Sequence, residues 1–129
     1  MLKEGSDVTL VAWGAMLHET LAAAKKLEEQ GISAEVIDVA TIKPLDIATI
    51  LASVEKTGRC VIIHEAPKTC GVGAEIAAQI AEHALMSLQA PVQRITGYDT
   101  VVPYFQLEKN YLPSEAKILK TVRHLMEIA

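Results

Sequence analysis

The strongest constraint on this chain is a regular alternation of short β-branched runs with longer amphipathic segments along its 129 residues. Runs that alternate or are fully apolar predict strands, and apolar residues three and four positions apart predict helices. Three strand–helix repeats, a fourth strand and a closing helix predict an α/β fold, with a parallel sheet covered by helices on both faces. The predicted strands are residues 7–12, 34–39, 60–63 and 92–96, and the predicted helices are residues 18–30, 46–57, 72–88 and a last helix after residue 113.

Glycines and one serine mark the predicted helix boundaries. Gly31 and Gly58 directly follow the first two helical patterns, where a left-handed glycine commonly ends a helix. Ser114 is the predicted N-cap of the last helix, because its hydroxyl can accept a hydrogen bond from a free backbone N–H. With no internal repeat or linker between these segments, we expect residues 1–129 to form a single domain.

Composition narrows the classes of function. Half of the residues are hydrophobic and the net charge is −4, which excludes intrinsic disorder and argues against nucleic-acid or anionic-membrane binding. No apolar run reaches the roughly 18 residues of a bilayer span, and residues 1–7 do not form a signal peptide. Two cysteines are too few for a secreted disulfide scaffold. We therefore expect a cytoplasmic protein that binds neither nucleic acid nor membrane.

Residues 97–113 interrupt the alternation with a long segment that lacks clear periodicity. Loops of this length are uncommon unless they are functional. The segment holds four of the five aromatic residues, Tyr98, Tyr104, Phe105 and Tyr111. It is interpreted either as a loop packed on its own side chains or as a contact surface for another chain, since aromatic residues are enriched at interfaces. The two interpretations are compatible.

The common phosphate-binding motifs are absent from the sequence. The turn after the first strand has Gly14 alone, where a dinucleotide site has three glycines. Gly71 and Gly73 precede the third helix and can offer backbone amides to an anion. Neither a third glycine nor a lysine follows them, so close packing at a helix entry is the favoured interpretation.

Metal and nucleophile chemistry are not indicated either. The four histidines lie on separate predicted elements without ligand spacing, and Cys60 and Cys70 lack a second cysteine pair. Cys60 falls in an apolar strand, which predicts a packed rather than a reactive thiol. We expect no metal site.

His64 and Glu65 are the most suggestive pair. They end the third strand, and in a sheet of order 2-1-3-4 they face Trp13 across the topological switch point, where open α/β sheets bind ligands. A histidine beside a carboxylate supports acid–base chemistry. One hypothesis is a small-ligand or anion site formed by Trp13, His64, Glu65, Gly71 and Gly73. The favoured alternative is that the pair bonds loop amides or a partner subunit, because no nucleophile, metal cluster or phosphate loop accompanies it.

Several motifs occur in a specific order along the chain: residues 5–14 (GSDVTLVAWG), 35–39 (EVIDV), 41–46 (TIKPLD), 54–59 (VEKTGR), 64–67 (HEAP), 73–76 (GAEI), 90–91 (AP), 94–100 (RITGYDT) and 111–113 (YLP). Together they resemble one known family, the C-terminal domain of the β subunit of 2-oxoacid dehydrogenases. This domain has the transketolase C-terminal domain fold, and the resemblance covers essentially the whole chain. It implies a three-layer α/β/α sandwich with a mostly parallel sheet and an antiparallel edge strand before Gly5, which we expect to be cut short here.

The resemblance implies the activity of a longer enzyme, which oxidatively decarboxylates 2-oxoisovalerate or pyruvate and passes the acyl group to a lipoyl group. Thiamine diphosphate is its cofactor and is bound outside this domain, so no catalytic, cofactor-binding or metal-binding residue carries over. The N-terminal thiamine-binding domain is missing, and we expect a fragment that is inactive alone. Residues 97–100 resemble the branched-chain members slightly more than the pyruvate members. The implied location is the bacterial cytoplasm, or the mitochondrial matrix in a eukaryote.

The resemblance also implies protein partners: the α subunit, a second β subunit in a heterotetramer, and the subunit-binding domain of the acyltransferase. In the family, docking of the acyltransferase uses the terminal carboxylate, here on Ala129, and an acidic residue at the position of Gln89. An uncharged Gln89 weakens the expected ion pairing with a basic partner. The predicted partner-binding residues are Gln89, Asp99, Tyr104, Phe105 and Ala129.

Overall fold

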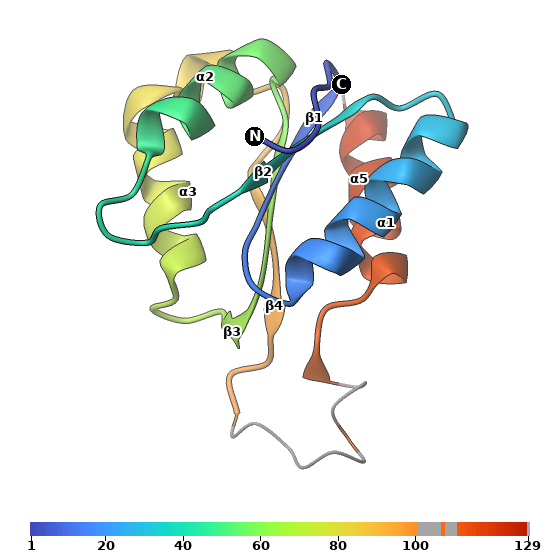
Figure 1. The fold of residues 1–129 in the computed structure, drawn as a ribbon. Coiled ribbons are helices and arrows are strands. Elements are labelled where there is room, and N and C mark those ends of the chain that lie inside the picture. The colour runs from blue at the N-terminus through green and yellow to red at the C-terminus, as the bar shows by residue number, and fades with distance from the viewer. Residues whose placement is uncertain (101–106, 108–110, 129) are drawn as a thin grey trace.

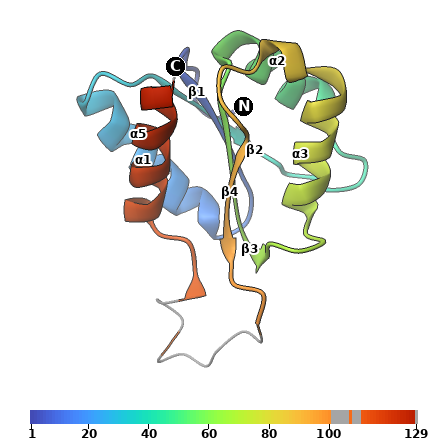
Figure 2. The same ribbon diagram turned by 180° about the vertical axis from the view of Figure 1, so that it is seen from behind.

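The computed structural model describes residues 1–100, 107 and 111–128 and shows a three-layer α/β/α sandwich (Figure 1). Its parallel sheet has the strand order β2-β1-β3-β4. Helices α1 and α5 cover one face, and α2 and α3 cover the other (Figure 2). The predicted fold class and strand order are both confirmed. The elements are β1 (Val8–Ala12), α1 (Met16–Glu29), β2 (Ala34–Asp38), α2 (Ile47–Thr57), β3 (Cys60–Pro67), α3 (Val72–His83), a 3₁₀ turn (Leu85–Ser87), β4 (Gln93–Gly97) and α5 (Glu115–Ile128).

The sheet is buried on both faces, which explains why its central strands β1 and β3 are largely apolar. Successive residues of one strand point to opposite faces, so Leu10 and Val11 of β1 belong to different core clusters. Ile62 and Ile63 of β3 divide in the same way. The cluster under α1 and α5 includes Leu27, Ile118, Val122 and Leu125, and that under α2 and α3 includes Ile37, Ile50, Val54, Ile76 and Ile80.

The predicted helix boundaries at three positions are confirmed. Gly31 and Gly58 have φ of 81° and 72°, the left-handed conformation that a glycine adopts without steric cost. The Ser114 hydroxyl accepts a hydrogen bond from the backbone N–H of Lys117 at 3.3 Å. These positions are set by local chemistry, so the sequence alone identifies them.

Two predicted boundaries are wrong. The third helix ends at His83 rather than at residue 88, because Ala84 leaves the helical conformation and a 3₁₀ turn follows. The chain then turns back, and the N–H of Gln89 donates to the carbonyl of Gly58 at 2.8 Å. The third strand is longer than predicted, since β3 runs past Ile63 to Pro67 across a register irregularity against β4.

Residues 2–3 extend the sheet beyond β2 by an antiparallel bridge. Leu2 donates to the carbonyl of Val36 and Val36 donates to that of Lys3, both at 2.9 Å. This is the place where the family resemblance implies an antiparallel edge strand. The buried carboxylate of Glu35 holds the next turn, because it accepts from the N–H of Gly5 at 3.1 Å and pairs with Lys56. No helix in the described residues is long and apolar enough to cross a bilayer.

Three buried hydroxyl groups join β1 to α2 inside the second core cluster. The hydroxyl of Thr9 lies 2.7 Å from that of Ser53 and 2.8 Å from that of Thr57, and Thr57 donates to the carbonyl of Arg59 at 3.0 Å. All three side chains are almost fully buried. Each hydroxyl therefore depends on the others for its hydrogen bonds.

We expect Thr9→Val to lower the free energy of unfolding by about 1–3 kcal/mol, because Ser53 and Thr57 lose a shared partner without gaining water. Urea unfolding of both proteins measures this difference. The control is Thr41→Val at an exposed position, which we expect to change stability by less than about 0.5 kcal/mol. Equal effects of the two substitutions would show that the hydroxyl network does not stabilise the fold.

Candidate functional site

The carboxyl end of the sheet contains the predicted switch point, because β1 leads to α1 on one face and the neighbouring β3 leads to α3 on the other. Trp13 follows β1, and His64 lies in β3. Their rings stack with centroids 5.2 Å apart and an interplanar angle of 12°. The imidazole is 1% exposed, so the indole and its surroundings close it off from solvent. The structure thus brings Trp13 and His64 together at the predicted place.

Gly71 and Gly73 lie directly against the same imidazole. A Cβ atom added at Gly73 would lie 2.7 Å from Cδ2 of His64, and one at Gly71 would lie 3.1 Å from Cε1. Only a residue without a side chain lets the start of α3 approach the ring this closely. Close packing against His64 therefore accounts for both glycines, which agrees with the favoured interpretation of this segment.

His64 is a buried polar group without a hydrogen-bond partner for either ring nitrogen in the described part of the chain. Burial and, secondarily, the nearby positive charge of Arg94 hold the pKa of His64 below its usual range. The imidazole is thus neutral at neutral pH and offers one donor and one acceptor rather than a positive charge.

Glu65 does not join this group. Its side chain is exposed, while that of the preceding His64 is buried. Both residues belong to β3, where successive side chains point to opposite faces of the sheet. Of the five residues in the small-ligand hypothesis, four lie together and Glu65 points away from them.

The other candidate metal ligands and nucleophiles among the described residues do not gather in one place. Residues 1–100, 107 and 111–128 contain no cluster of three or more His, Cys, Asp or Glu side chains that can hold a metal ion. Cys60 is fully buried, and burial raises the pKa of its thiol to about 12. Cys70 is exposed and has φ of 57°. Cys60 is the packed thiol that its apolar strand predicts.

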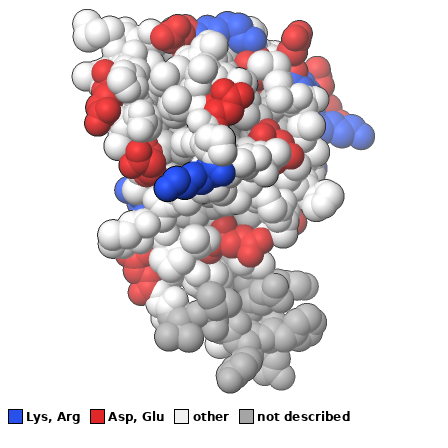
Figure 3. Space-filling view, turned by 60° about the vertical axis from the view of Figure 1, so that its left-hand side comes forward, with Lys and Arg blue, Asp and Glu red and all other residues white. Residues whose placement is uncertain are grey.

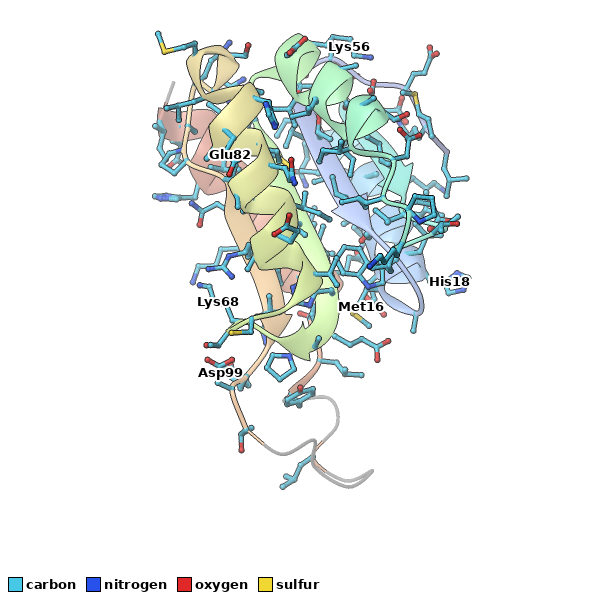
Figure 4. All side chains as sticks on the ribbon, turned by 90° about the vertical axis from the view of Figure 1, so that its left-hand side faces the viewer. Met16, His18, Lys56, Lys68, Glu82 and Asp99 are labelled. Atoms are coloured by element: carbon cyan, nitrogen blue, oxygen red, sulfur yellow. The ribbon has the colours of Figure 1, made fainter. Side chains whose placement is uncertain are left out.

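The predicted partner-binding residues lie at opposite ends of the sheet. Gln89 is exposed and bonds Gly58 just before β3 begins, at the amino end of the strands, where α5 also finishes (Figure 1). Asp99 follows β4 at the carboxyl end, beside Lys68 (Figure 4). Hydrogen bonds from the hydroxyl and backbone N–H of Thr69 hold the pKa of the Asp99 carboxyl below its usual range. Tyr104, Phe105 and Ala129 lie outside the described residues.

The two described aromatic residues of the long segment differ in their burial. Tyr111 is buried against Gly97, as expected for a loop packed on its own side chains. Tyr98 is 59% exposed. The burial of Tyr111 agrees with the first interpretation of this segment, and the contact surface stays a prediction.

The turn before Gln89 exposes apolar side chains, which the sequence pattern does not indicate. Leu85 and Met86, in the 3₁₀ turn before Gln89, are 58% and 96% exposed. The sequence pattern places both residues in the predicted helix 72–88, where apolar side chains are expected to be buried. Their exposure follows from the early end of α3 and places an apolar surface beside Gln89.

The fold and this site define an α/β/α domain with a four-stranded parallel sheet and packed rings at its switch point. Residues 1–118 match the family described as transketolase, C-terminal domain, and the chain belongs to that family.

Curated relatives extend the match to nearly the whole chain. It is 49% identical over 125 residues to the pyruvate dehydrogenase E1 component subunit beta of Bacillus subtilis, covering 97% of this chain and 38% of the relative. The corresponding subunit of Staphylococcus epidermidis is 48% identical over the same length. The resemblance to the C-terminal domain of 2-oxoacid dehydrogenase β subunits is confirmed. The chain spans 38% of the length of these relatives.

Solved structures agree with the fold. A split-gene transketolase, described as an inactive β4 tetramer, superposes with a TM-score of 0.84 at 34% identity, covering 98% of this chain and 40% of that one. A 2-oxoglutarate:ferredoxin oxidoreductase from Magnetococcus marinus superposes with a TM-score of 0.65 at 13% identity, covering 98% and 19%. The second likeness shows the shared fold alone.

We expect His64 to make stability depend on pH. A folded-state pKa below the ordinary value of 6.5 means that the unfolded chain binds a proton more readily. The stabilising contribution is complete above about pH 6.5 and is lost as the pH falls toward the folded-state pKa. Acid should therefore lower the free energy of unfolding less in His64→Asn than in the unsubstituted chain, between about pH 7 and pH 5.

Urea unfolding at several pH values measures the two slopes, and His18→Gln at an exposed position is the control. An NMR titration of the His64 ring tests the same point without a substitution. A ring that titrates at or above pH 6.5 would contradict the expectation.

Proposed function

We propose that this chain is the C-terminal domain of the β subunit of a pyruvate-type 2-oxoacid dehydrogenase, and that it pairs subunits rather than supplying catalytic residues. The observation that carries the proposal is 49% identity over 97% of the chain to a pyruvate dehydrogenase β subunit, of which the chain spans 38%. The named relatives favour pyruvate over a branched-chain oxo acid. The longer protein is then an oxidoreductase, and residues 1–129 are one domain of it.

Thiamine diphosphate, the cofactor of this enzyme class, does not fit the switch point of this domain. The space beside Gly71 and Gly73 is filled by the imidazole of His64. That ring is neutral, since burial lowers its pKa, and gives a diphosphate no positive charge. These residues therefore support binding of the cofactor by other parts of the enzyme.

Both ends of the sheet offer contact surfaces, and we assign the amino end to the acyltransferase. Gln89 stands where the family resemblance implies docking of the acyltransferase. Leu85 and Met86 add exposed apolar area beside Gln89, which offsets the missing acidic charge. Asp99, Tyr104 and Phe105 follow β4 in the chain and are assigned to contacts with the α subunit or the second β subunit.

A chimera tests the proposed function. The 125 matched residues of this chain replace the corresponding region of the Bacillus subtilis β subunit, which is then expressed with its α subunit. We expect the chimera to assemble like the parent and to decarboxylate pyruvate in preference to 2-oxoisovalerate, because the two regions are 49% identical. Sedimentation velocity and a decarboxylation assay measure the two properties. A folded chimera that stays apart from the α subunit would refute the assembly role.

The docking assignment is tested by Leu85→Ser with Met86→Ser in the same chimera. We expect binding of the acyltransferase's subunit-binding domain to weaken about tenfold or more, because two exposed apolar side chains are lost from the contact. Calorimetric titration measures the affinity. Ile42→Ser, at another exposed apolar position, is the control and should leave the affinity unchanged. Unchanged affinity in the double variant would exclude this turn from the docking surface.

A further inference from the structure

A groove with basic side chains runs along the outer edge of the sheet and is lined by residues of β4 and α5. Figure 2 shows where these two elements lie. The volume of the groove is about 620 Å³, within the range of small-molecule sites. In the described part of the chain, no strand pairs with the outer side of β4. We call this hollow the β4 groove. Its charged lining residues are Lys68, Arg94, Asp99, Lys117 and Lys120, and His124 also lines it.

The charge of the β4 groove is opposite to that of the whole chain. The chain has a net charge of −4, yet the groove holds four of its twelve lysines and arginines and one of its sixteen acidic residues. Acidic side chains are instead scattered over the face that carries α2 and α3 (Figure 3). A hollow lined by one sign of charge concentrates ions of the opposite sign.

Most of the positive charge of the groove has no counter-charge within the described residues. Lys3, Lys26 and Lys56 pair with glutamates elsewhere, whereas no carboxylate in the described part of the chain forms an ion pair with a cation of the groove. Asp99 accepts hydrogen bonds from Thr69, and its negative charge offsets that of the neighbouring Lys68. The remaining like charges repel one another, and a bound anion relieves that repulsion.

The cations that line the groove come from three separate segments. Because Arg94 is paired with Ile62, its side chain lies on the face of the sheet that α2 and α3 cover, whereas Lys117 and Lys120 lie on α5 over the other face. Lys68 follows β3, and Arg94 lies in β4 and donates to the carbonyl of Lys68 at 2.9 Å. Lys117 and Lys120 lie one turn apart on the side of α5 that lines the groove. The ammonium group of Lys117 lies 5.3 Å from the centre of the Tyr98 ring, which positions it at the mouth of the groove.

We propose that the β4 groove binds a small molecule that carries two or more phosphate groups. Four cations along the two sides of the sheet edge exceed what a single negative charge requires, whereas a chain of phosphates offers anionic oxygens along that edge. The forked guanidinium of Arg94 suits a phosphate group, and the lysines add point charges. The site shares only Arg94 with the surroundings of His64, and the inference does not depend on the proposed function.

Calorimetric titration of the 129-residue chain with sodium tripolyphosphate tests the proposal. We expect binding that weakens as salt rises, and an affinity about tenfold or more lower in the double variant Lys117→Gln with Lys120→Gln. The control, Lys25→Gln with Lys43→Gln, removes the same charge from exposed sites outside the groove and should change the affinity by about twofold at most. Orthophosphate should bind more weakly than tripolyphosphate.

Equal losses in the two double variants would overturn the proposal, because they would show unspecific attraction. Absence of tripolyphosphate binding would overturn it as well. A glutamate-rich peptide that binds the chain where tripolyphosphate does not would overturn it in favour of an acidic protein segment as the occupant.

Discussion

Burial of the sheet on both faces is the constraint on which the rest of the structure depends. The central strands β1 and β3 place alternate residues in two separate core clusters, so neither face of the sheet is free to bind another molecule. A parallel sheet of this kind is stable only when helices cover both sides. The parts of the sheet that other molecules can reach are the two ends of its strands and the outer edge of β4. Every surface with a proposed function lies at one of those places.

At the carboxyl end of the strands, packed side chains fill the place where many α/β enzymes have an active site. The switch point of an open sheet is commonly a crevice because the two flanking helices diverge there. In this chain Trp13 and His64 stack across it, and Gly71 and Gly73 bring α3 close to the imidazole. A crevice filled in this way favours a domain that acts through its surface, in keeping with a role in pairing subunits.

The fold was predictable from the sequence because its signals are local. Glycines such as Gly31 and Gly58 end helices by their own backbone freedom, and short β-branched runs bounded by turn residues favour strands. The sequence did not indicate that the side chains of His64 and Glu65 point to opposite faces, because this depends on β3 continuing beyond Ile63. The exposure of Met86 could not be predicted, because a helical pattern does not show where the core that the helix packs against ends. Lysines dozens of residues apart form a groove only after the sheet and α5 are in place.

The cations beside β4 exceed what protection of a free sheet edge requires. Charged side chains on an edge strand commonly prevent pairing with another molecule, and Arg94 alone places such a charge on β4. Lys117 and Lys120 belong to α5 instead, and Lys68 belongs to the segment after β3. Charges that only protect the edge need not come from other elements, because their mutual repulsion lowers stability. Cations from three segments that line one hollow in an otherwise acidic chain therefore favour a multiply charged anion as its occupant.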